Sequence, residues 1–219
     1  MSFSDTGLDD SNPDDVSRKI MMVGDGQVGK TSFIKCISGE MFDPSVKPTT
    51  QLDTHTFTSF DQLDQFNVSR KVNVWDSSND NMHVIAYWRW YRYIDGFVLL
   101  FSEDVEKSWA NVQNWIDEVR RNTDSPIVVC WNKTDMDVDI STIKKKEKII
   151  GQRIHLISVK DGNGLNNVMK DLFGKIDKYQ KDEMDKKNAI KERYQADQAK
   201  NYTSLNKPEK KPKKGCSVM

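Results

Sequence analysis

The 219-residue chain carries 33 basic and 33 acidic side chains, and its net charge of zero argues against a protein that coats nucleic acid with its whole surface. Hydrophobic residues make up 37% of the sequence and the mean hydropathy is −0.71, so part of the chain is expected to lie outside a packed core. No apolar run approaches the roughly 20 residues that span a bilayer, and three scattered cysteines (Cys36, Cys130 and Cys216) predict neither a disulfide framework nor a zinc site.

The first elements alternate between strand and helix. Residues 1–16 are polar and acidic, which predicts a disordered segment without a secretory signal. The apolar run 19–23 is typical of a short buried strand, and it leads through a glycine-rich turn into a helix over 31–38. Residues 52–60 alternate in polarity and 69–75 form the next strand, so the two predict a β-hairpin.

The second half of the chain continues the alternation. The continuous apolar runs 97–102 and 126–131 are typical of parallel strands covered on both faces. Between them, apolar residues at helical spacing predict a helix over 105–122. Residues 153–158 predict the last strand, and the apolar stripe from Leu165 to Tyr179 predicts a final amphipathic helix.

This order of elements predicts an α/β fold with three layers. We expect a doubly wound, six-stranded, mostly parallel sheet with one antiparallel hairpin, over residues 17–180. Residues 181–206 keep their charge but lose the apolar stripe, which leaves open a helical or a disordered extension. Residues 207–219 are expected to form a polybasic, disordered tail, because Lys207–Lys214 holds five lysines and one glutamate.

The first strand runs into a phosphate-binding loop of the pattern G-x-x-x-x-G-K-[ST]. Its glycines let the backbone wrap phosphates with N–H groups pointing inward, and the following helix adds its dipole. In such a loop Lys30 reaches the β- and γ-phosphates and the Thr31 hydroxyl ligates Mg²⁺, which predicts a P-loop nucleoside triphosphate site. The candidate residues are Gly24, Asp25, Gly26, Gln27, Val28, Gly29, Lys30, Thr31 and Ser32.

A second motif, N-K-x-D, predicts which base is bound. It follows the strand at 126–131, and a carboxylate there can accept hydrogen bonds from the N1–H and N2–H₂ groups of guanine, which adenine lacks. Asp135 therefore predicts selection for GTP and GDP, while the stem of Lys133 can lie over the purine plane. The remaining candidates for the base are Asn132 and, after the next strand, Ser158, Val159 and Lys160.

These motifs resemble those of the Ras superfamily of small GTPases. GDGQVGKT, WDSS, NKTD and SVK occur in the family's order and near its spacings over about residues 17–180, which implies a P-loop G domain. Thr49 resembles the switch I threonine that binds Mg²⁺ and the γ-phosphate, and Phe42 resembles the aromatic residue that packs on guanine. Asp76 resembles the acid that holds Mg²⁺ through water, so the implied metal set is Thr31, Thr49 and Asp76. Several stretches, VNVWD among them, are most similar to the Ran branch.

The segment after Asp76 departs from the family's D-x-x-G-Q pattern. Asn79 replaces the glycine that meets the γ-phosphate, but asparagine keeps an N–H and tolerates positive φ, so contact with the nucleotide is still expected. Asp80 replaces the glutamine that orients the attacking water. A carboxylate repels the γ-phosphate and cannot donate to the transition-state oxygens, so we expect slow hydrolysis, with Asp80, Thr49 and Lys30 as catalytic residues.

Two further departures lie near the base and ribose. Val46 stands where many members have a tyrosine over the nucleotide, and Trp131 stands where a glycine usually precedes N-K-x-D, which puts the fit of the base pocket in question. The resemblance implies effector, exchange-factor and GTPase-activating partners that bind 43–51 and 76–93. Aromatic residues in the second segment could anchor such a partner, although core packing is the simpler expectation for most of them.

The C-terminal residues Cys216-Ser217-Val218-Met219 have the pattern of a C-a-a-X box, and the final methionine favours farnesylation of Cys216. The lysines of 207–214 supply a second, electrostatic membrane signal worth about 1 kcal/mol per lysine. The alternative is a solvated basic tail. The sequence thus predicts a protein on the cytoplasmic face of a membrane, with a cytosolic pool.

Two functions remain open on the sequence. The first is a membrane-tethered guanine-nucleotide switch that hydrolyses GTP slowly, in signalling or trafficking. The second is a pseudo-GTPase that keeps its nucleotide and acts as an interaction scaffold, which Asn79 and Asp80 favour. No nucleic-acid partner is expected in either case.

Overall fold

The computed structural model describes residues 17–61, 68–77, 89–136 and 138–205. The chain divides into two units after Asp177, and each is described by itself. The first unit contains all the strands of the described residues. The tail with Cys216, and the pair Asn79 and Asp80, lie outside the described residues.

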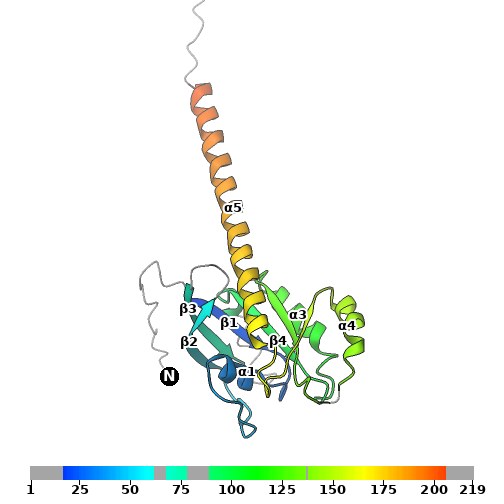
Figure 1. The fold of residues 1–219 in the computed structure, drawn as a ribbon. Coiled ribbons are helices and arrows are strands. Elements are labelled where there is room, and N and C mark those ends of the chain that lie inside the picture. Colours follow the sequence, from blue (N-terminus) through cyan, green and yellow to red (C-terminus); the bar gives the residue numbers. More distant parts are fainter. Residues whose placement is uncertain (1–16, 62–67, 78–88, 137, 206–219) are drawn as a thin grey trace, which may run out of the picture. The chain divides into compact units, whose positions relative to one another are not determined.

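The described strands form one six-stranded sheet in the order β2-β3-β1-β4-β5-β6 (Figure 1). Within it β2 and β3 pair antiparallel, whereas the other neighbouring pairs are parallel, with Ile20 opposite both Val74 and Gly96. This confirms the predicted α/β sheet and its hairpin. The strands are β1 (Arg18–Val23), β2 (Asp53–Asp61), β3 (Val68–Asp76), β4 (Gly96–Phe101), β5 (Ile127–Trp131) and β6 (Ile154–Leu156).

Helices cover both faces of the sheet, because successive strand residues point to opposite sides. Ile20 and Met22 pack with Phe33 of α1 and with the first turns of α5, whereas Met21 and Leu99 pack on the other face with α3 and α4. The layers are therefore helix, sheet and helix, as predicted. The helices are α1 (Lys30–Ile37), α3 (Val112–Arg120), η1 (Ile140–Thr142), α4 (Ile143–Ile150) and α5 (Leu165–Leu205).

The helix predicted over 105–122 is too long, because α3 begins only at Val112. The backbone of Lys107 has φ 65, in the left-handed region that a helix cannot contain. The Ser108 side chain also accepts from the Ser102 N–H and donates to the Ser102 carbonyl, which closes the preceding loop on itself. The apolar spacing at Val105 thus reflects packing of a turn, not of a helix.

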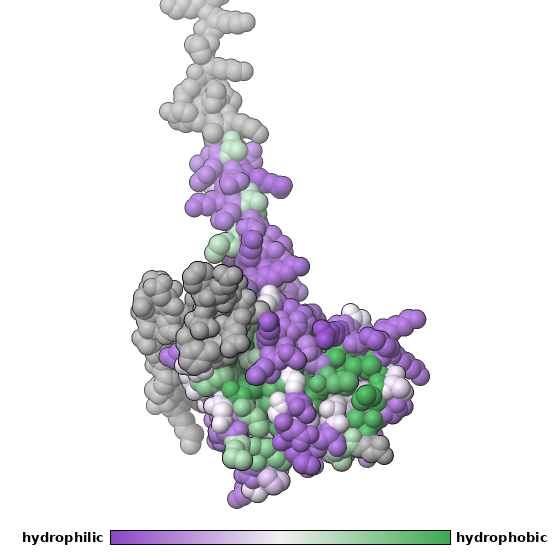
Figure 2. All heavy atoms as spheres, viewed as in Figure 1, coloured by the Kyte–Doolittle hydropathy of each residue, from purple (hydrophilic) through white to green (hydrophobic). Residues whose placement is uncertain are grey.

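The second unit is the outer part of α5, which is helical from Lys178 to Leu205. The face of this helix that Figure 2 shows is mainly hydrophilic, with scattered apolar residues. Its exposed large hydrophobic side chains include Met184, Ile190 and Tyr194. Pairs such as Glu183 and Lys186, 2.8 Å apart, lie one helical turn from each other. None of the described helices combines the length and the apolar character needed to cross a membrane.

Candidate functional site

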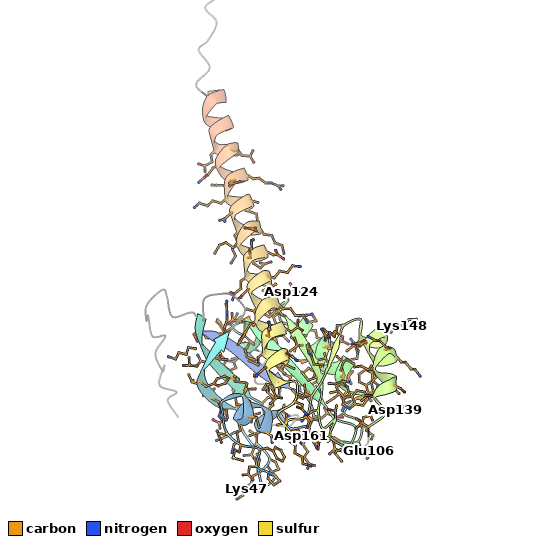
Figure 3. The ribbon with its side chains drawn as sticks, viewed as in Figure 1. Lys47, Glu106, Asp124, Asp139, Lys148 and Asp161 are labelled. Carbon is orange, nitrogen blue, oxygen red and sulfur yellow. The ribbon has the colours of Figure 1, made fainter. Side chains whose placement is uncertain are left out.

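A cleft of about 570 Å³ lies where the carboxyl ends of β1, β4, β5 and β6 give way to loops. This is the edge at which open α/β sheets bind ligands, and the volume lies within the range of small-molecule sites. Figure 3 shows Lys47, Glu106 and Asp161, which lie on or beside these loops, at one end of the domain and Asp124 at the other.

The phosphate-binding loop connects β1 to α1 and needs glycine at two places. Gly24 has φ +130, and a Cβ there would lie 2.2 Å from the Leu100 carbonyl oxygen. Gly29 has φ +99, and a Cβ there would lie 2.4 Å from Nδ2 of Asn132. Any side chain at either position would push the loop off β4 or off the N-K-x-D segment.

Lys30 is the first residue of α1, and its side chain folds back over the loop. Its Nζ donates to the carbonyl oxygens of Gly24 and Asp25, at 2.9 and 2.8 Å. Burial lowers the pKa of the ammonium to about 8, although the Asp76 and Asp25 carboxylates oppose that change. The loop thus holds a buried cation at the floor of the cleft, which suits a phosphate ligand.

Three oxygen-bearing side chains meet beside this lysine. The Thr31 hydroxyl lies 2.7 Å from the Thr49 hydroxyl and donates to Oδ2 of Asp76 at 2.5 Å, while Thr49 donates to the same oxygen at 3.0 Å. Among the residues that the structure describes, Oδ1 of Asp76 is buried and has no hydrogen-bond partner. An orphaned carboxylate oxygen beside two hydroxyls fits Mg²⁺, which prefers oxygen ligands and usually keeps several waters.

Asn132 joins the two halves of the cleft. Its Nδ2 donates to the Val28 carbonyl at 2.8 Å, and its Oδ1 accepts from the backbone N–H of Val159 at 3.1 Å. The side chain is buried. It therefore ties the phosphate-binding loop to the loop after β6.

Asp135 is held as an ionised acceptor. Oδ1 accepts from the Ser158 hydroxyl at 2.8 Å, and Oδ2 lies 3.5 Å from Nζ of Lys160. Desolvation raises the pKa of this carboxyl, but the Ser158 hydrogen bond and the Lys160 charge outweigh it and hold the pKa below its usual range. An ionised carboxylate is the state that accepts from a base edge with two donors.

Most of the predicted site residues that the structure describes line this cleft. Those among its lining are Gln27, Gly29, Lys30, Thr31, Ser32, Phe42, Thr49, Asn132, Lys133, Asp135, Val159 and Lys160. Those that the described lining leaves out are Gly24, Asp25, Gly26, Val28, Asp76 and Ser158.

Asp104 is a lining residue that the sequence analysis missed. Its Oδ2 accepts from Nζ of Lys133 at 2.5 Å, and its Oδ1 accepts from the Ser102 hydroxyl. Desolvation raises the pKa of the Asp104 carboxyl, but these two donors outweigh it and hold the pKa below its usual range. The signal was available, because Asp104 follows β4 just as Asp135 follows β5.

Trp131 does not crowd the cleft, which answers the question that its position raised. Its side chain is fully buried on the face of the sheet that α3 and α4 cover, where it stacks on Phe101 with ring centroids 5.6 Å apart. The Lys146 ammonium lies 4.7 Å from the ring centroid. Val46, the other departure, does line the cleft.

The aromatic segment after residue 86 divides between core and surface. Tyr91 is buried and packs on Phe97, as most of the segment was expected to do. Trp90 and Tyr93 are instead 47% and 52% exposed, and Trp90 lies 5.6 Å from Trp75, centroid to centroid. Within the described residues, core packing therefore accounts for only part of this segment.

Known proteins are similar to this chain in sequence. The family model described as "Ras of Complex, Roc, domain of DAPkinase" matches residues 19–135, more than half of the chain. The "Ras and EF-hand domain-containing protein homolog" of Caenorhabditis elegans is 27% identical over 172 residues, which are 74% of this chain and 26% of that protein. The chain thus spans about a quarter of the length of its nematode relatives.

Two shorter relatives match over similar lengths. The "GTP-binding nuclear protein GSP1" of Encephalitozoon cuniculi is 31% identical over 137 residues, covering 62% of this chain and 59% of that protein. The "Ras-related protein Rab-3B" of Mus musculus is 23% identical over 153 residues, covering 68% of each chain. With the cleft geometry and the family match over residues 19–135, the chain belongs to the Ras superfamily of small GTPases.

Proposed function

We propose that this protein is a guanine-nucleotide switch that binds GTP or GDP with Mg²⁺ and hydrolyses GTP slowly, in signalling or trafficking. The observation that carries the proposal is the meeting of Lys30, Thr31 and Asp135 in one cleft of about 570 Å³. Each serves a different part of the ligand: the phosphates, the metal and the base. The similarity to the "GTP-binding nuclear protein GSP1" supports the same ligand.

The residues of the cleft would divide the work of binding and hydrolysis. Lys30 would neutralise phosphate charge at the floor of the cleft, and Thr31, Thr49 and Asp76 would hold the metal. When bound, Mg²⁺ would neutralise charge that develops between the β- and γ-phosphates. Thr49 contacts Thr31 and Asp76, so these two contacts attach the 43–51 segment to the residues that would hold the metal.

The alternative proposal is a pseudo-GTPase that keeps its nucleotide and acts as a scaffold. Asn79 and Asp80 favour it, because Asn79 lacks the conformational freedom of the family's glycine and Asp80 lacks the hydrogen-bond donor of the family's glutamine. The two proposals share the ligand and differ only in turnover. Hydrolysis of bound GTP therefore separates them.

Asp80→Gln should raise the single-turnover rate of GTP hydrolysis, on the order of 10- to 100-fold, because an amide can donate to the transition-state oxygens whereas a carboxylate repels them. Asn79→Gly combined with Asp80→Gln should exceed either single change, since both act on one loop. The measurement is phosphate release from GTP preloaded on wild type and the three variants. A wild-type rate at or above that of Asp80→Gln would contradict slow hydrolysis, and retained GTP without turnover in wild type would favour the scaffold.

We also propose that the protein is membrane-tethered, with a farnesyl group on Cys216 and the lysines of Lys207–Lys214 on anionic lipid. Five lysines and one glutamate give this segment a net charge of about +4. One lipid chain binds a membrane reversibly, so the basic segment is the second signal that holds the protein there. On the cytoplasmic face it would meet effector, exchange-factor and GTPase-activating proteins through 43–51 and 76–93.

Cys216→Ser should move the full-length protein from the membrane pellet to the soluble fraction of cells, because it removes the lipidated thiol. Replacing the five lysines of 207–214 by glutamine should weaken pelleting with anionic vesicles but leave lipidation intact. Fractionation and a farnesyl-transfer assay measure the two effects. Ser217→Ala is the matched control, since it leaves the cysteine and the last residue in place. Wild-type protein found only in the soluble fraction would remove the tether.

A further inference from the structure

The phosphate-binding loop is tied to the start of α3 by the side chain of Asp25. Oδ1 accepts from the Trp115 indole N–H at 2.7 Å, and Oδ2 accepts from the Asn111 side-chain amide at 2.6 Å. The two donors lie four residues apart on one helical turn. In that turn the backbone N–H of Trp115 donates to the backbone carbonyl of Asn111 at 3.0 Å. Both carboxylate oxygens are thus taken up by a single turn of helix, 86 and 90 residues further along the chain.

The same residue also orients the phosphate-binding lysine. The backbone carbonyl of Asp25 accepts from Nζ of Lys30 at 2.8 Å. Asp25 therefore contacts α3 with its side chain and Lys30 with its main chain. Any shift of Asp25 relative to α3 would move one of the two carbonyls that hold the ammonium.

The bonds to Asp25 are well placed to resist such a shift. Both are charge-assisted and partly buried, which makes them shorter and stronger than bonds between neutral groups. The indole of Trp115 is also packed against the core cluster that contains Val112 and Phe101, so the donor cannot swing away without disturbing that packing. The loop is thus fastened to a rigid part of the domain.

We propose that Asp25, Asn111 and Trp115 are positioning residues that keep the phosphate-binding loop in the conformation that retains the β-phosphate. The inference rests on the proposed function, since it concerns how the same cleft holds GDP. It assigns a role to three side chains that do not appear in the cleft's described lining. The loop motif itself accounts only for Gly24, Gly29, Lys30 and Thr31.

The test compares release of methylanthraniloyl-GDP, in Mg²⁺, from wild type and three variants of the full chain. Trp115→Phe should speed release roughly 10-fold and Asp25→Ala roughly 10- to 100-fold, because they remove one and two charge-assisted bonds. The double variant should release no faster than Asp25→Ala alone, since both changes break the same bond. Trp109→Phe is the matched control, because that indole packs on Phe101 with centroids 5.1 Å apart, and its release rate should equal that of wild type.

A second readout separates positioning from general loosening of the fold. Competition with unlabelled GMP, which lacks the β-phosphate, should give the same affinity for wild type and Trp115→Phe, whereas GDP affinity falls. Asp25→Asn keeps one oxygen that can accept from the indole, so its rate of GDP release should lie between those of wild type and Asp25→Ala. GDP release at the wild-type rate from both Trp115→Phe and Asp25→Ala would overturn the inference and leave the proposed function standing. A loss of GMP affinity that parallels the loss of GDP affinity would do the same. A wild-type protein that retains neither GDP nor GTP would overturn the proposed function instead.

Discussion

Lys30→Ala should weaken GDP and GTP binding by roughly 10²- to 10³-fold, as measured by equilibrium titration at constant Mg²⁺. The lysine is buried at the floor of the cleft, and it is held by two carbonyls 2.9 and 2.8 Å away. Removing it leaves the negative charge of the nearby Asp76 carboxylate without the cation that offsets it when phosphates are bound. Repulsion is thus added to the loss of the ion pair, which is why the expected effect exceeds that of an ordinary hydrogen bond.

Lys35→Ala is the matched control for this change. Lys35 lies on the same helix and faces Glu40 at 3.9 Å, with its side chain 32% exposed. It should leave both affinities within about twofold, because exposed ion pairs contribute little. Equal affinities for Lys30→Ala and Lys35→Ala would show that the phosphates lie elsewhere.

Thr31→Asn extends the same argument to the metal end of the cleft. Asparagine replaces the hydroxyl that contacts both Thr49 and Asp76. It should therefore harm GTP binding more than GDP binding, because Thr31 would hold the Mg²⁺ that neutralises the larger charge of the triphosphate. An unchanged Mg²⁺-dependent affinity for GTP in Thr31→Asn would contradict the role assigned to this hydroxyl.

The sheet and the site motifs could be predicted because their signals are local. A continuous apolar run such as 126–131 and a polar motif placed directly after it are visible in a few consecutive residues, and β5 does end at Trp131. Parallel strands then bring their carboxyl ends to one edge, so Lys30 and Asp135 meet although 105 residues separate them, from position 30 to position 135.

Features that depend on tertiary contacts could not be predicted in this way. The residues 105–111 have helical apolar spacing, but a left-handed Lys107 and the Ser102–Ser108 bonds make them a turn. Trp131 packs on the face of the sheet that the pleat of β5 gives it. Comparing it with the family's glycine at this position does not reveal that face. The pairing of Lys133 with Asp104 joins two loops 29 residues apart, and no local pattern contains it.

Asp135→Asn should reverse the base preference of the cleft, lowering affinity for GTP and raising affinity for XTP, a swing of about 10²- to 10⁴-fold in their ratio. The carboxylate would accept from N1–H and N2–H₂ of guanine, whereas the asparagine amide offers one acceptor and one N–H₂ donor. Xanthine has an oxygen acceptor at its 2-position and keeps N1–H, so the amide N–H₂ can donate to the first while the amide oxygen accepts from the second. Competition of GTP, XTP and ATP against a labelled guanine nucleotide measures the change.

The matched control and the pH dependence make this prediction specific. Asp161→Asn makes the same substitution at a carboxylate that accepts from the same Ser158 hydroxyl, at 3.1 Å, but that is not among the cleft's described lining. It should leave the ratio of GTP to XTP affinity unchanged. Because the Ser158 bond and the Lys160 charge hold the pKa of the Asp135 carboxyl below its usual range, the wild-type preference for GTP should persist as the pH falls through the range in which an ordinary carboxyl group is protonated. It should be lost only as the acceptor is protonated below that. Equal wild-type affinities for ATP and GTP, or an Asp135→Asn variant that still prefers GTP, would show that another group recognises the base.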